Sequence, residues 1–545
     1  LTGRRLKSIF NLKSGAMDKN AQEQLNLTFT KLNEAESRGK TAHKKVSAAM
    51  MASGNPYLDF RKALNGDDQY AHLLEDQDVE SAILKSLGIP VEFPDDVKSE
   101  IESIVATQSN PADLLDDPKR EDLTHLPFVT IDGADARDFD DAVLSYPDED
   151  PANKGGNILW VAIADVAHYV RPGTALDLEA RKRGNSVYLP KKVVPMLPEE
   201  LSNGLCSLRP DEHRACMAYE IKINKKGRIL QRQLHQGVMI SKARLTYDQV
   251  MNATEGNADE LIAPIKENTS RCLIAEEMIA ANMCASMDQR NAKRGIYRIH
   301  DDPSAGNIDA LEELKMLGVI THLEIQNGID KSQINMNRLI AKAEECANPE
   351  HAKKMIVRLQ AKAEYSTENI GHFGLQIPDS VGYSHFTSPI RRYPDLLVHR
   401  NLKNQFNFAS GMMPGQLSKE LQGILEECSM TERRANDASQ KASEQYVMRH
   451  LAKLEGQVIK AKICCASAED GIKISITELN LETYIKIRDL PKGPYKYDSV
   501  SQSLVNEDSG HTFPVGHTIN VTIPSVGTNG EALPVFKLAS PDQML

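Results

Sequence analysis

The sequence predicts a multidomain α+β protein with a helical N-terminal region, a central region of interleaved strands and helices, and a small C-terminal β-barrel. The chain has 545 residues, which exceeds a single small hydrophobic core and predicts two to four domains. Its composition, with 41% hydrophobic and 26% charged residues, is typical of globular proteins. Strand-like patterns begin near residue 110 and dominate the last ninety residues.

The N-terminal part is predicted to be helical from residue 18 to about 108, where alanine, lysine and glutamate are frequent. Residues 1–17 contain four cationic side chains and no acidic one. We interpret this segment as a solvated basic arm or as a remnant of processing or cloning, with a transit-peptide remnant as the alternative. Residues 18–110 form the predicted N-terminal region and linker.

The central region, residues 111–454, alternates between apolar strand-like runs and helical runs, which indicates one α+β domain. The predicted strands are PFVTI (127–131), NILWVAIADV (157–166), RACMAYEIKIN (214–224) and RILQRQLHQGVMI (228–240). Predicted helices cover 174–183 and 272–290, and long amphipathic helices are expected within 305–370 and 415–454.

The C-terminal region, residues 455–545, returns to strand patterns such as GQVIKAKICCA and HTINVTIPSV. Several short strands within a hundred residues predict a small barrel, and five of them would make an OB fold.

Composition also limits the class of protein. No stretch approaches the roughly 18 apolar residues that a membrane helix needs, so we expect no membrane partner. The eight cysteines form no CxxC pair, which is typical of a reducing compartment and predicts a cytoplasmic protein, with an organelle as the alternative. The net charge of −11 does not exclude a nucleic-acid partner, because binding depends on where the cations lie. We expect a monomer.

The segment DGADARDFDDAV (132–143) contains five aspartates. It follows the predicted strand 127–131, so Asp132 is expected at the carboxyl end of that strand. The loop that follows is expected to hold three more aspartates, Asp138, Asp140 and Asp141. Oxygen ligands suit hard cations such as Mg²⁺, with Mn²⁺ as a second possibility, and four carboxylates suit two ions at a phosphoryl group. The alternative is a solvated acidic loop.

A second segment, HFTSPIRRYPDLLVHR (385–400), places Arg391 and Arg392 beside Ser388-Pro389, whose proline fixes the local backbone. A guanidinium held in this way can bind phosphate and stabilise charge that develops on it. The alternative is a helix start with surface cations. Carboxylates that bind metal, together with a positioned arginine, indicate phosphodiester hydrolysis.

With both segments in view, the sequence resembles the RNase II / RNase R family of 3′→5′ exoribonucleases, which share the RNB catalytic domain. Further matches are WVAIADVAHYV, VYLPKKVVPMLPEELSNGLCSLRP, ARLTYDQV, GIYRIHDDP and MTERRANDA. The resemblance spans about residue 80 to the end of the chain. It implies that the four aspartates bind metal, that Asp140 and Arg391 are catalytic, and that single-stranded RNA is the partner.

The resemblance also implies RNA contacts at Tyr188, Tyr247, Arg392 and Glu432. Tyr188 matches an aromatic that clamps bases, and such stacking tolerates any sequence because every base has a π-face. The alternative for Tyr188 is a half-buried core tyrosine. The expected reaction is stepwise hydrolysis from the 3′ end to nucleoside 5′-monophosphates by a two-metal mechanism. The alternatives are a catalytically silent RNA-binding regulator of the same fold and a DNA-directed or general phosphodiesterase.

Overall fold

The structure is a computed structural model that describes residues 78–108, 110–247, 249–250, 270–290, 295–301, 308–320, 336–346, 349–406, 417–454, 456–476, 481–498, 503–523 and 536–539. The predicted basic arm, 1–17, and the helices predicted for 18–77 lie outside these residues. Among the described helices, none is both long enough and apolar enough to span a membrane.

The described N-terminal part consists of two helices and a 3₁₀ turn that lead to the central region. The helices are α5 (Asp78–Ser86) and α6 (Asp95–Thr107), and the turn is η2 (Pro111–Asp116). Pro94 precedes α6, and two aspartates in its first turn complement the positive end of the helix dipole. Leu84 of α5 is fully buried in a small apolar cluster that also includes Ala438 of the long helix α16 (Leu417–Lys453).

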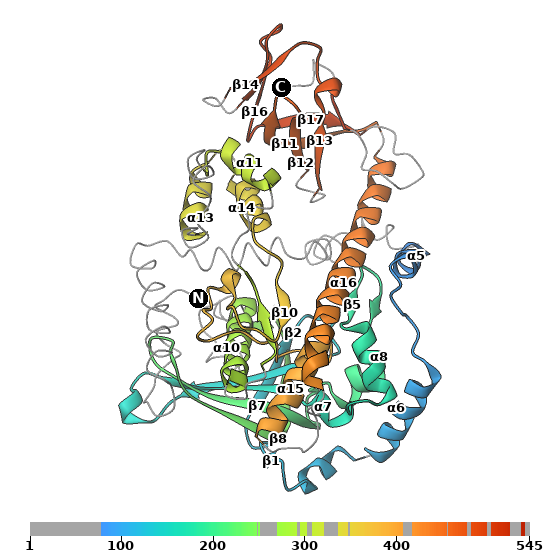
Figure 1. Cartoon of the computed structure of the whole chain (residues 1–545), viewed down its shortest axis with the longest axis vertical. Helices are drawn as coiled ribbons and strands as arrows, with labels where there is room; N and C mark the ends of the chain where they lie inside the picture. The colour runs from blue at the N-terminus through green and yellow to red at the C-terminus, as the bar shows by residue number, and fades with distance from the viewer. Residues whose placement is uncertain are drawn as a thin grey trace.

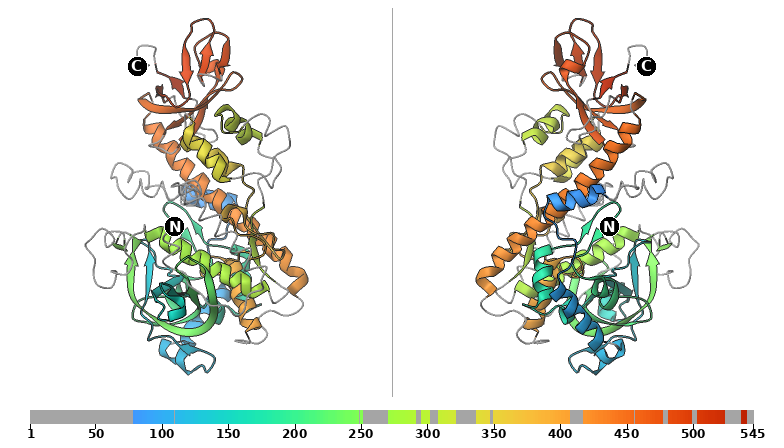
Figure 2. Two further views of the ribbon diagram at one scale, coloured as in Figure 1. Left: turned by 90° about the vertical axis from the view of Figure 1, so that its left-hand side faces the viewer. Right: turned by 90° about the vertical axis from the view of Figure 1, so that its right-hand side faces the viewer.

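The central sheet is a ring of strands. Its members are β1 (Glu121–Asp122), β2 (Phe128–Asp132), β3 (Asp141–Pro147), β4 (Asn157–Ala164), β7 (His213–Ile223) and β8 (Ile229–Thr246). They are paired in the order β1-β8-β2-β3-β4-β7. The long strand β8 closes the ring, because its first part pairs with β7 in antiparallel fashion and its last part pairs with β2 in parallel. Figure 2 shows these strands curving together at the end of the molecule away from the C-terminal strands.

Two buried helices pack against this sheet and form the largest hydrophobic core with it. They are α10 (Ser270–Arg290) and α15 (Tyr393–Gln405). Shorter elements complete this part: α7 (Val166–Tyr169), α8 (Ala175–Arg183), β5 (Val187–Tyr188), β6 (Val193–Val194), the π-helix η4 (Glu200–Leu205), β9 (Tyr297–Ile299), β10 (Glu364–Ser366) and η7 (Phe373–Leu375). The predicted strands and the helices at 174–183 and 272–290 are therefore present.

The C-terminal strands form two small antiparallel sheets. The first has the order β13-β12-β11-β17-β18, and the second has the order β14-β15-β16. Their bounds are β11 (Val458–Ser467), β12 (Gly471–Ile476), β13 (Leu481–Ile485), β14 (Tyr495–Asp498), β15 (Ser503–Asn506), β16 (Thr512–Pro514), β17 (Thr518–Thr522) and β18 (Lys537–Leu538), with η9 (Ile487–Asp489) between β13 and β14. The predicted β-rich unit is present, and its assignment as an OB fold stays a prediction.

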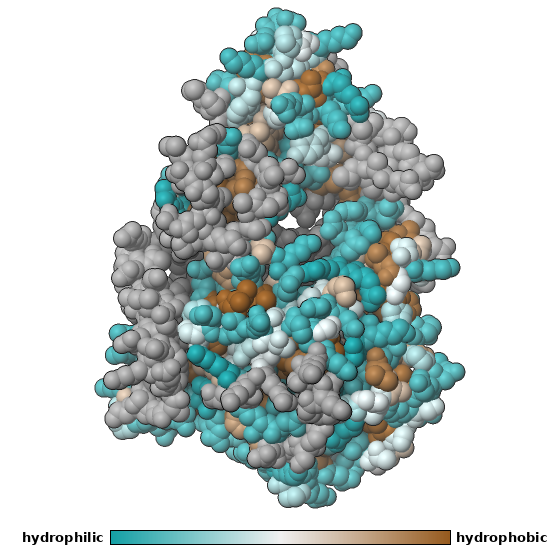
Figure 3. Space-filling view, viewed as in Figure 1, coloured by the Kyte–Doolittle hydropathy of each residue, from teal (hydrophilic) through white to brown (hydrophobic). Residues whose placement is uncertain are grey.

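The helix α16 links the two parts of the molecule. It has 37 residues, which corresponds to about 55 Å at the usual rise per residue, and it was predicted as a long helix. Figure 1 shows it running from the helices beside the central sheet to the C-terminal strands. In the space-filling view the described surface is mostly hydrophilic, with apolar side chains in small separate patches (Figure 3).

The segment 305–370 differs from the prediction of long helices. Its described part holds three shorter helices, α11 (Ile308–Met316), α13 (Met336–Glu345) and α14 (Pro349–Arg358), followed by the strand β10. Pro349 explains one interruption, because proline favours the first turn of a helix and disrupts an interior one. These helices share a hydrophobic core with the C-terminal strands, so they pack with that unit as well as belonging to the predicted central region.

Candidate active site

The acidic segment begins where β2 ends. Phe128 and Ile131 are buried, and this apolar run between β8 and β3 makes the strand. Asp132 is its last residue and lies opposite Thr246, the last residue of β8. The prediction that Asp132 terminates a buried strand is therefore confirmed by the position of β2.

Two side chains from distant segments hold the loop after β2. The Ser207 hydroxyl donates to the Arg137 carbonyl over 2.7 Å and accepts from the Phe139 amide over 3.1 Å. The Arg244 guanidinium donates to the carbonyl oxygens of Gly133 (2.9 Å) and Ala134 (2.6 Å). Sequence reasoning assigned no role to Ser207 or Arg244, although both lie in the quoted motifs CSLRP and ARLTYDQV.

The second half of the acidic segment departs slightly from prediction. Asp138 and Asp140 lie on the loop as expected, whereas Asp141 is the first residue of β3 and pairs with Ile163 of β4. The carboxylate of Asp140 is buried; its Oδ1 accepts from the Ile390 amide over 2.9 Å. This bond joins the acidic loop to residues 385–400, which we call the arginine segment, across 250 residues of sequence.

The two arginines of the second segment differ in their surroundings. Arg391 places Nε 3.4 Å from Oδ2 of Asp140 and donates from Nη2 to the Ser388 hydroxyl over 2.9 Å. Its side chain is still 43% exposed, so it can contact a bound substrate. Arg392 instead donates over 2.8 Å to Asp395, whose carboxylate is fully buried and also accepts from the Ser388 amide. Arg391 is therefore available to a ligand, while Arg392 holds a buried charge.

The carboxyls of this cluster, which we call the acidic centre (Asp132, Asp138, Asp140 and Asp141), are incompletely compensated. Burial, and then the charge of Asp138, raises the pKa of Asp132 to about 6, against the opposing charges of Arg391 and Arg244. Burial, and then Asp132, raises the pKa of Asp141 to about 7. Burial also raises the pKa of Asp140 well above its usual range, although Arg391 opposes this. In each case desolvation outweighs the nearby positive charge.

The donor chemistry of the acidic centre fits a hard divalent cation, but its geometry is not that of a formed site. Oδ2 of Asp132 and Oδ2 of Asp140 are buried and have no hydrogen-bond partner within the described ranges. Buried oxygens of this kind are costly unless a cation or donor meets them. Among the residues that the structure describes, however, no three carboxylate, imidazole or thiolate groups converge so that they could hold one ion. The positive charge beside Asp140 is the Arg391 guanidinium.

Two predicted RNA-contacting tyrosines lie next to the acidic centre. The Tyr188 hydroxyl donates to Oδ2 of Asp138 over 3.2 Å, and the ring is half-buried, which also agrees with the alternative of a core tyrosine. Its carbonyl accepts from Ser439 of α16 over 2.6 Å. Tyr247 directly follows Thr246, so it lies at the same edge of the sheet as Asp132. Their roles toward RNA remain predictions.

The fourth predicted RNA contact, Glu432 on α16, binds a cation of the protein itself. Arg298 of β9 donates to both of its carboxylate oxygens, over 2.7 and 3.0 Å. The same guanidinium lies 4.5 Å from the centre of the Tyr365 ring, and the Tyr365 hydroxyl bonds to Nδ1 of His385 over 2.8 Å. Glu432 is thus connected to the arginine segment through Arg298, which sequence reasoning missed.

Polar side chains on α10 hold the chain that enters the arginine segment. Asn282 donates to the Tyr383 hydroxyl over 2.9 Å and accepts from the Phe386 amide over 2.7 Å. One turn further along α10, Ser286 donates to the Val381 carbonyl over 3.2 Å. These contacts hold the chain from Val381 to Phe386 against α10.

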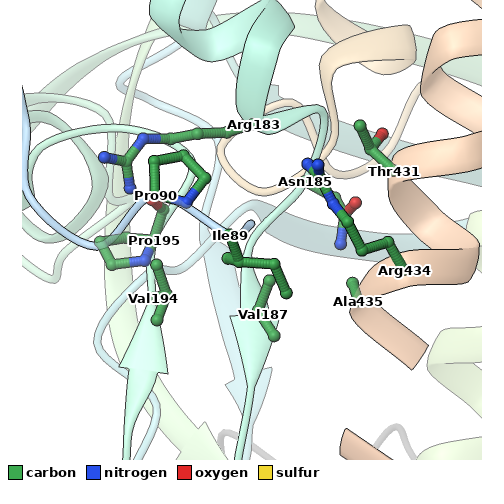
Figure 4. A pocket seen from close by; sticks show the side chains of 10 residues that line it. All are labelled: Ile89, Pro90, Arg183, Asn185, Val187, Val194, Pro195, Thr431, Arg434 and Ala435. Carbon is green, nitrogen blue, oxygen red and sulfur yellow. Dashed lines mark hydrogen bonds between the residues drawn. The ribbon is translucent and has the colours of Figure 1, made fainter. Parts of the chain in front are cut away.

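A shallow pocket lies between β5, β6 and α16, lined among others by Asn185, Thr431 and Arg434 (Figure 4). Its enclosed space holds about one water molecule, and none of the four aspartates lines it. Asn185 forms an isolated bridge with Arg392, so the pocket adjoins the arginine segment. It is too small for a nucleotide.

Comparison with known proteins identifies the domain that these residues occupy. The sequence model of the RNB domain matches residues 120–266 and 260–407. Ribonuclease R of Vibrio cholerae is 34% identical over 508 residues, which cover 81% of this chain and 59% of that protein. Ribonuclease R of Thermotoga maritima is 32% identical over 504 residues, covering 82% and 68%. The chain thus spans about three fifths of the length of the first of these relatives.

Solved structures show the same fold. Mycoplasma genitalium RNase R, in complex with ribose-methylated single-stranded RNA, superposes with a TM-score of 0.71 at 26% identity, covering 84% of this chain and 77% of that one. Yeast Ssd1, a pseudonuclease, superposes with a TM-score of 0.57 at 18% identity over 75% of this chain and 58% of its own, which shows the fold alone.

Proposed function

The chain belongs to the RNB domain family, which includes Ribonuclease R, and on this premise we propose that it is a hydrolytic 3′→5′ exoribonuclease. Its substrate would be single-stranded RNA, and its products nucleoside 5′-monophosphates. The observation that supports this most is the exposed guanidinium of Arg391 beside the buried carboxylate of Asp140. A cation fixed next to carboxylates suits hydrolysis of a phosphodiester, since the attacked phosphate gains negative charge.

The residues of the acidic centre would hold divalent cations, Mg²⁺ or Mn²⁺, in a two-metal arrangement. Such ions lower the pKa of bound water and neutralise charge on the leaving oxygen. Among the described residues, Oδ2 of Asp132 and Oδ2 of Asp140 are buried without a hydrogen bond, which supports this assignment, although the Arg391 guanidinium lies beside Asp140. Asp141 would hold the ions from the start of β3, and Asp138 from the loop.

Arg391 would act on the phosphate itself. Asp140 and Ser388 fix its guanidinium at two nitrogens, so little conformational entropy is lost when a phosphate arrives. Its charge would stabilise the transition state more than the ground state, because the phosphate oxygens become more negative during attack.

Tyr188 would orient the 3′-terminal bases. The bond from its hydroxyl to Asp138 anchors the ring at the acidic loop, and a base stacked on that ring would bring its phosphate to the acidic centre. We propose contacts to RNA for Tyr247, Arg392 and Glu432 as well, of which Arg392 and Glu432 also hold the protein ion pairs described above.

Degradation of 5′-labelled single-stranded RNA in Mg²⁺, resolved on a gel, tests the proposed function. We expect a ladder that shortens from the 3′ end, and release of labelled mononucleotide at the earliest times from a matched 3′-labelled RNA. A chelator should stop both. Internal fragments from the 3′-labelled RNA would contradict an exonuclease.

A second candidate is a catalytically silent RNA-binding regulator. The observation in its favour is that no three metal-binding groups converge among the described residues. This candidate predicts RNA binding with no shortening of either labelled substrate in Mg²⁺ or Mn²⁺.

We also propose that the protein is a monomer and works in a reducing compartment, the cytoplasm or an organelle. The cysteines whose side chains the structure describes form no disulfide bond, which supports the reducing compartment. Sedimentation of the purified chain and imaging of a tagged copy test these two points.

A further inference from the structure

The helix α10 packs one face against the strands that hold the acidic centre. Ile274 and Met278 are one turn apart on α10 and lie on the same face of the helix. They join an apolar cluster with residues of β2, β3 and β8, namely Ile131, Val143 and Leu245. Ile131 immediately precedes Asp132. Val143 follows Asp141 by two positions, so Asp141 and Val143 point to the same side of β3.

One carboxylic acid lies on this face of α10. Glu277 is three residues after Ile274, which places it beside Ile274 and Met278 and toward the strands. Its side chain is only 8% exposed, and its Oε2 is buried with no hydrogen-bond partner in the part of the chain that the structure describes. Burial and, secondly, the negative charge of Asp141 raise the pKa of Glu277 to about 8. Asp141 of the acidic centre lies toward the same helix, because it shares the side of β3 that carries Val143.

A second buried acid on the same helix shows what a structural carboxylate needs. Asp288 accepts from the Tyr219 hydroxyl over 2.8 Å and from Nε of Arg232 over 2.7 Å. Both of its oxygens are satisfied within the protein, as is usual for a buried charge. No cation among the residues that the structure describes forms an ion pair with Glu277. A buried acid that is not satisfied by the protein, and that adjoins a set of other carboxylates, is suited to a ligand that the protein binds.

We propose that Glu277 is a further cation-binding residue of the acidic centre, acting from α10 on the side of Asp141. The inference rests on the proposed function, since it takes the divalent cations of that site as the ligand. It adds a fifth carboxylate from a helix that is remote in sequence from the acidic segment. The chemical class of ligand is a hard divalent cation, which prefers oxygen donors.

The test is the affinity of the full chain for Mn²⁺, measured from the electron paramagnetic resonance signal of the free ion. Glu277→Gln keeps the size of the side chain and removes its ability to ionise and bind a cation as a carboxylate. We expect its Mn²⁺ dissociation constant to rise by about 10- to 100-fold, the range typical of groups that support a metal site. The matched control is Glu276→Gln, because adjacent residues on a helix point in different directions.

Thermal unfolding without metal provides a second, independent readout. Glu277→Gln should unfold at the wild-type temperature or above it, since glutamine replaces a buried acid whose ionised form is disfavoured by desolvation. Glu277→Asp serves if the glutamine variant does not fold, and should bind Mn²⁺ with an affinity between the two.

Several results would overturn the inference. A change in the dissociation constant of less than threefold in Glu277→Gln, with Mn²⁺ bound normally by the wild type, removes Glu277 from the site and leaves the proposed function intact. An equal weakening in Glu276→Gln shows a general effect of charge on this helix and also overturns it. If the wild type binds no Mn²⁺ and degrades no RNA, the proposed function itself fails, and this inference with it.

Discussion

Two of the regions that bury charged side chains differ in how far cations balance the buried acids. The first is the acidic centre with its neighbour Glu277. The second, which we call the barrel junction, lies where α11 and α14 meet β12 and β13. There Glu313 binds Nε2 of His351 over 2.6 Å and Nζ of Lys473 over 3.0 Å, and Glu482 binds Lys354 over 3.0 Å.

The direction of the pKa shifts separates the two regions. At the barrel junction, burial alone would raise the pKa of Glu313 and Glu482, but the interactions with His351 and the charges of Lys473 and Lys354 outweigh it and lower both values. At the acidic centre, burial prevails and the pKa of Asp132, Asp140 and Asp141 is raised. Buried acids whose charge is balanced by cations stabilise a junction. Buried acids whose charge is only partly balanced are candidates for binding a ligand.

The largest expected effect of a single substitution is that of Asp140→Asn. It removes a charge from the acidic centre and weakens the hold on Arg391, so we expect the rate of RNA hydrolysis to fall by at least about 10²–10³. RNA binding should stay equal or become tighter, because a negative charge near the phosphates is lost. Single-turnover rates and filter-binding constants check this. Turnover within tenfold of the wild type would show that Asp140 is not catalytic.

Comparison of Arg391→Ala with Arg392→Ala separates an effect on the catalytic rate from an effect on stability. Arg391→Ala should lower the chemical rate about 10²-fold with a small change in affinity, since its charge is most useful in the transition state. Arg392→Ala should reduce the rate less and should lower the melting temperature more, because it leaves the buried carboxylate of Asp395 without its cation. The opposite ranking of rates would assign the catalytic role to Arg392.

Lys473→Met tests the barrel junction. The side chain is 5% exposed and lies between Glu313 and Glu482, so its removal leaves buried negative charge. We expect a loss of about 3 kcal/mol in the free energy of unfolding of this unit. The rate of hydrolysis per folded molecule should not change. Denaturant titration and single-turnover assays measure the two quantities, and a variant of unchanged stability would show that the junction is not a balanced charge cluster.

The smallest expected effect is a dependence of stability on pH. Burial would lower the pKa of His351, but its interactions with Cys464, Glu313 and Glu482 raise it to about 10. A raised value means that the stabilisation is fully present below the ordinary histidine pKa of about 6.5 and is lost as the pH rises through about 10. The melting temperature of the wild type should therefore fall across this window. The melting temperature of His351→Gln should fall less over the same pH range. An equal dependence of melting temperature on pH in both proteins would contradict the assignment.

Local sequence patterns predicted many residues of the site but few of the contacts that join its distant segments. Asp132 could be placed because five apolar or β-branched residues precede it, and Arg391 stood out because Ser388-Pro389 restricts its backbone. The bond between Asp140 and the Ile390 amide joins segments 250 residues apart, which no local pattern reveals. Glu277 was missed for the same reason, since helical periodicity does not show which strands a face will meet.

The central claim is that the incompletely compensated carboxyls of the acidic centre bind divalent cations. The metal dependence of thermal unfolding tests it most directly. The full chain would be unfolded in millimolar Mg²⁺ and in chelator at pH 7, beside Asp140→Asn and Lys473→Met. We predict that Mg²⁺ raises the melting temperature of the wild type and of Lys473→Met equally, by the equivalent of about 2.7 kcal/mol at a hundredfold excess over the dissociation constant. The melting temperature of Asp140→Asn should rise little on addition of Mg²⁺. Equal melting temperatures of the wild type with and without Mg²⁺ would contradict the account.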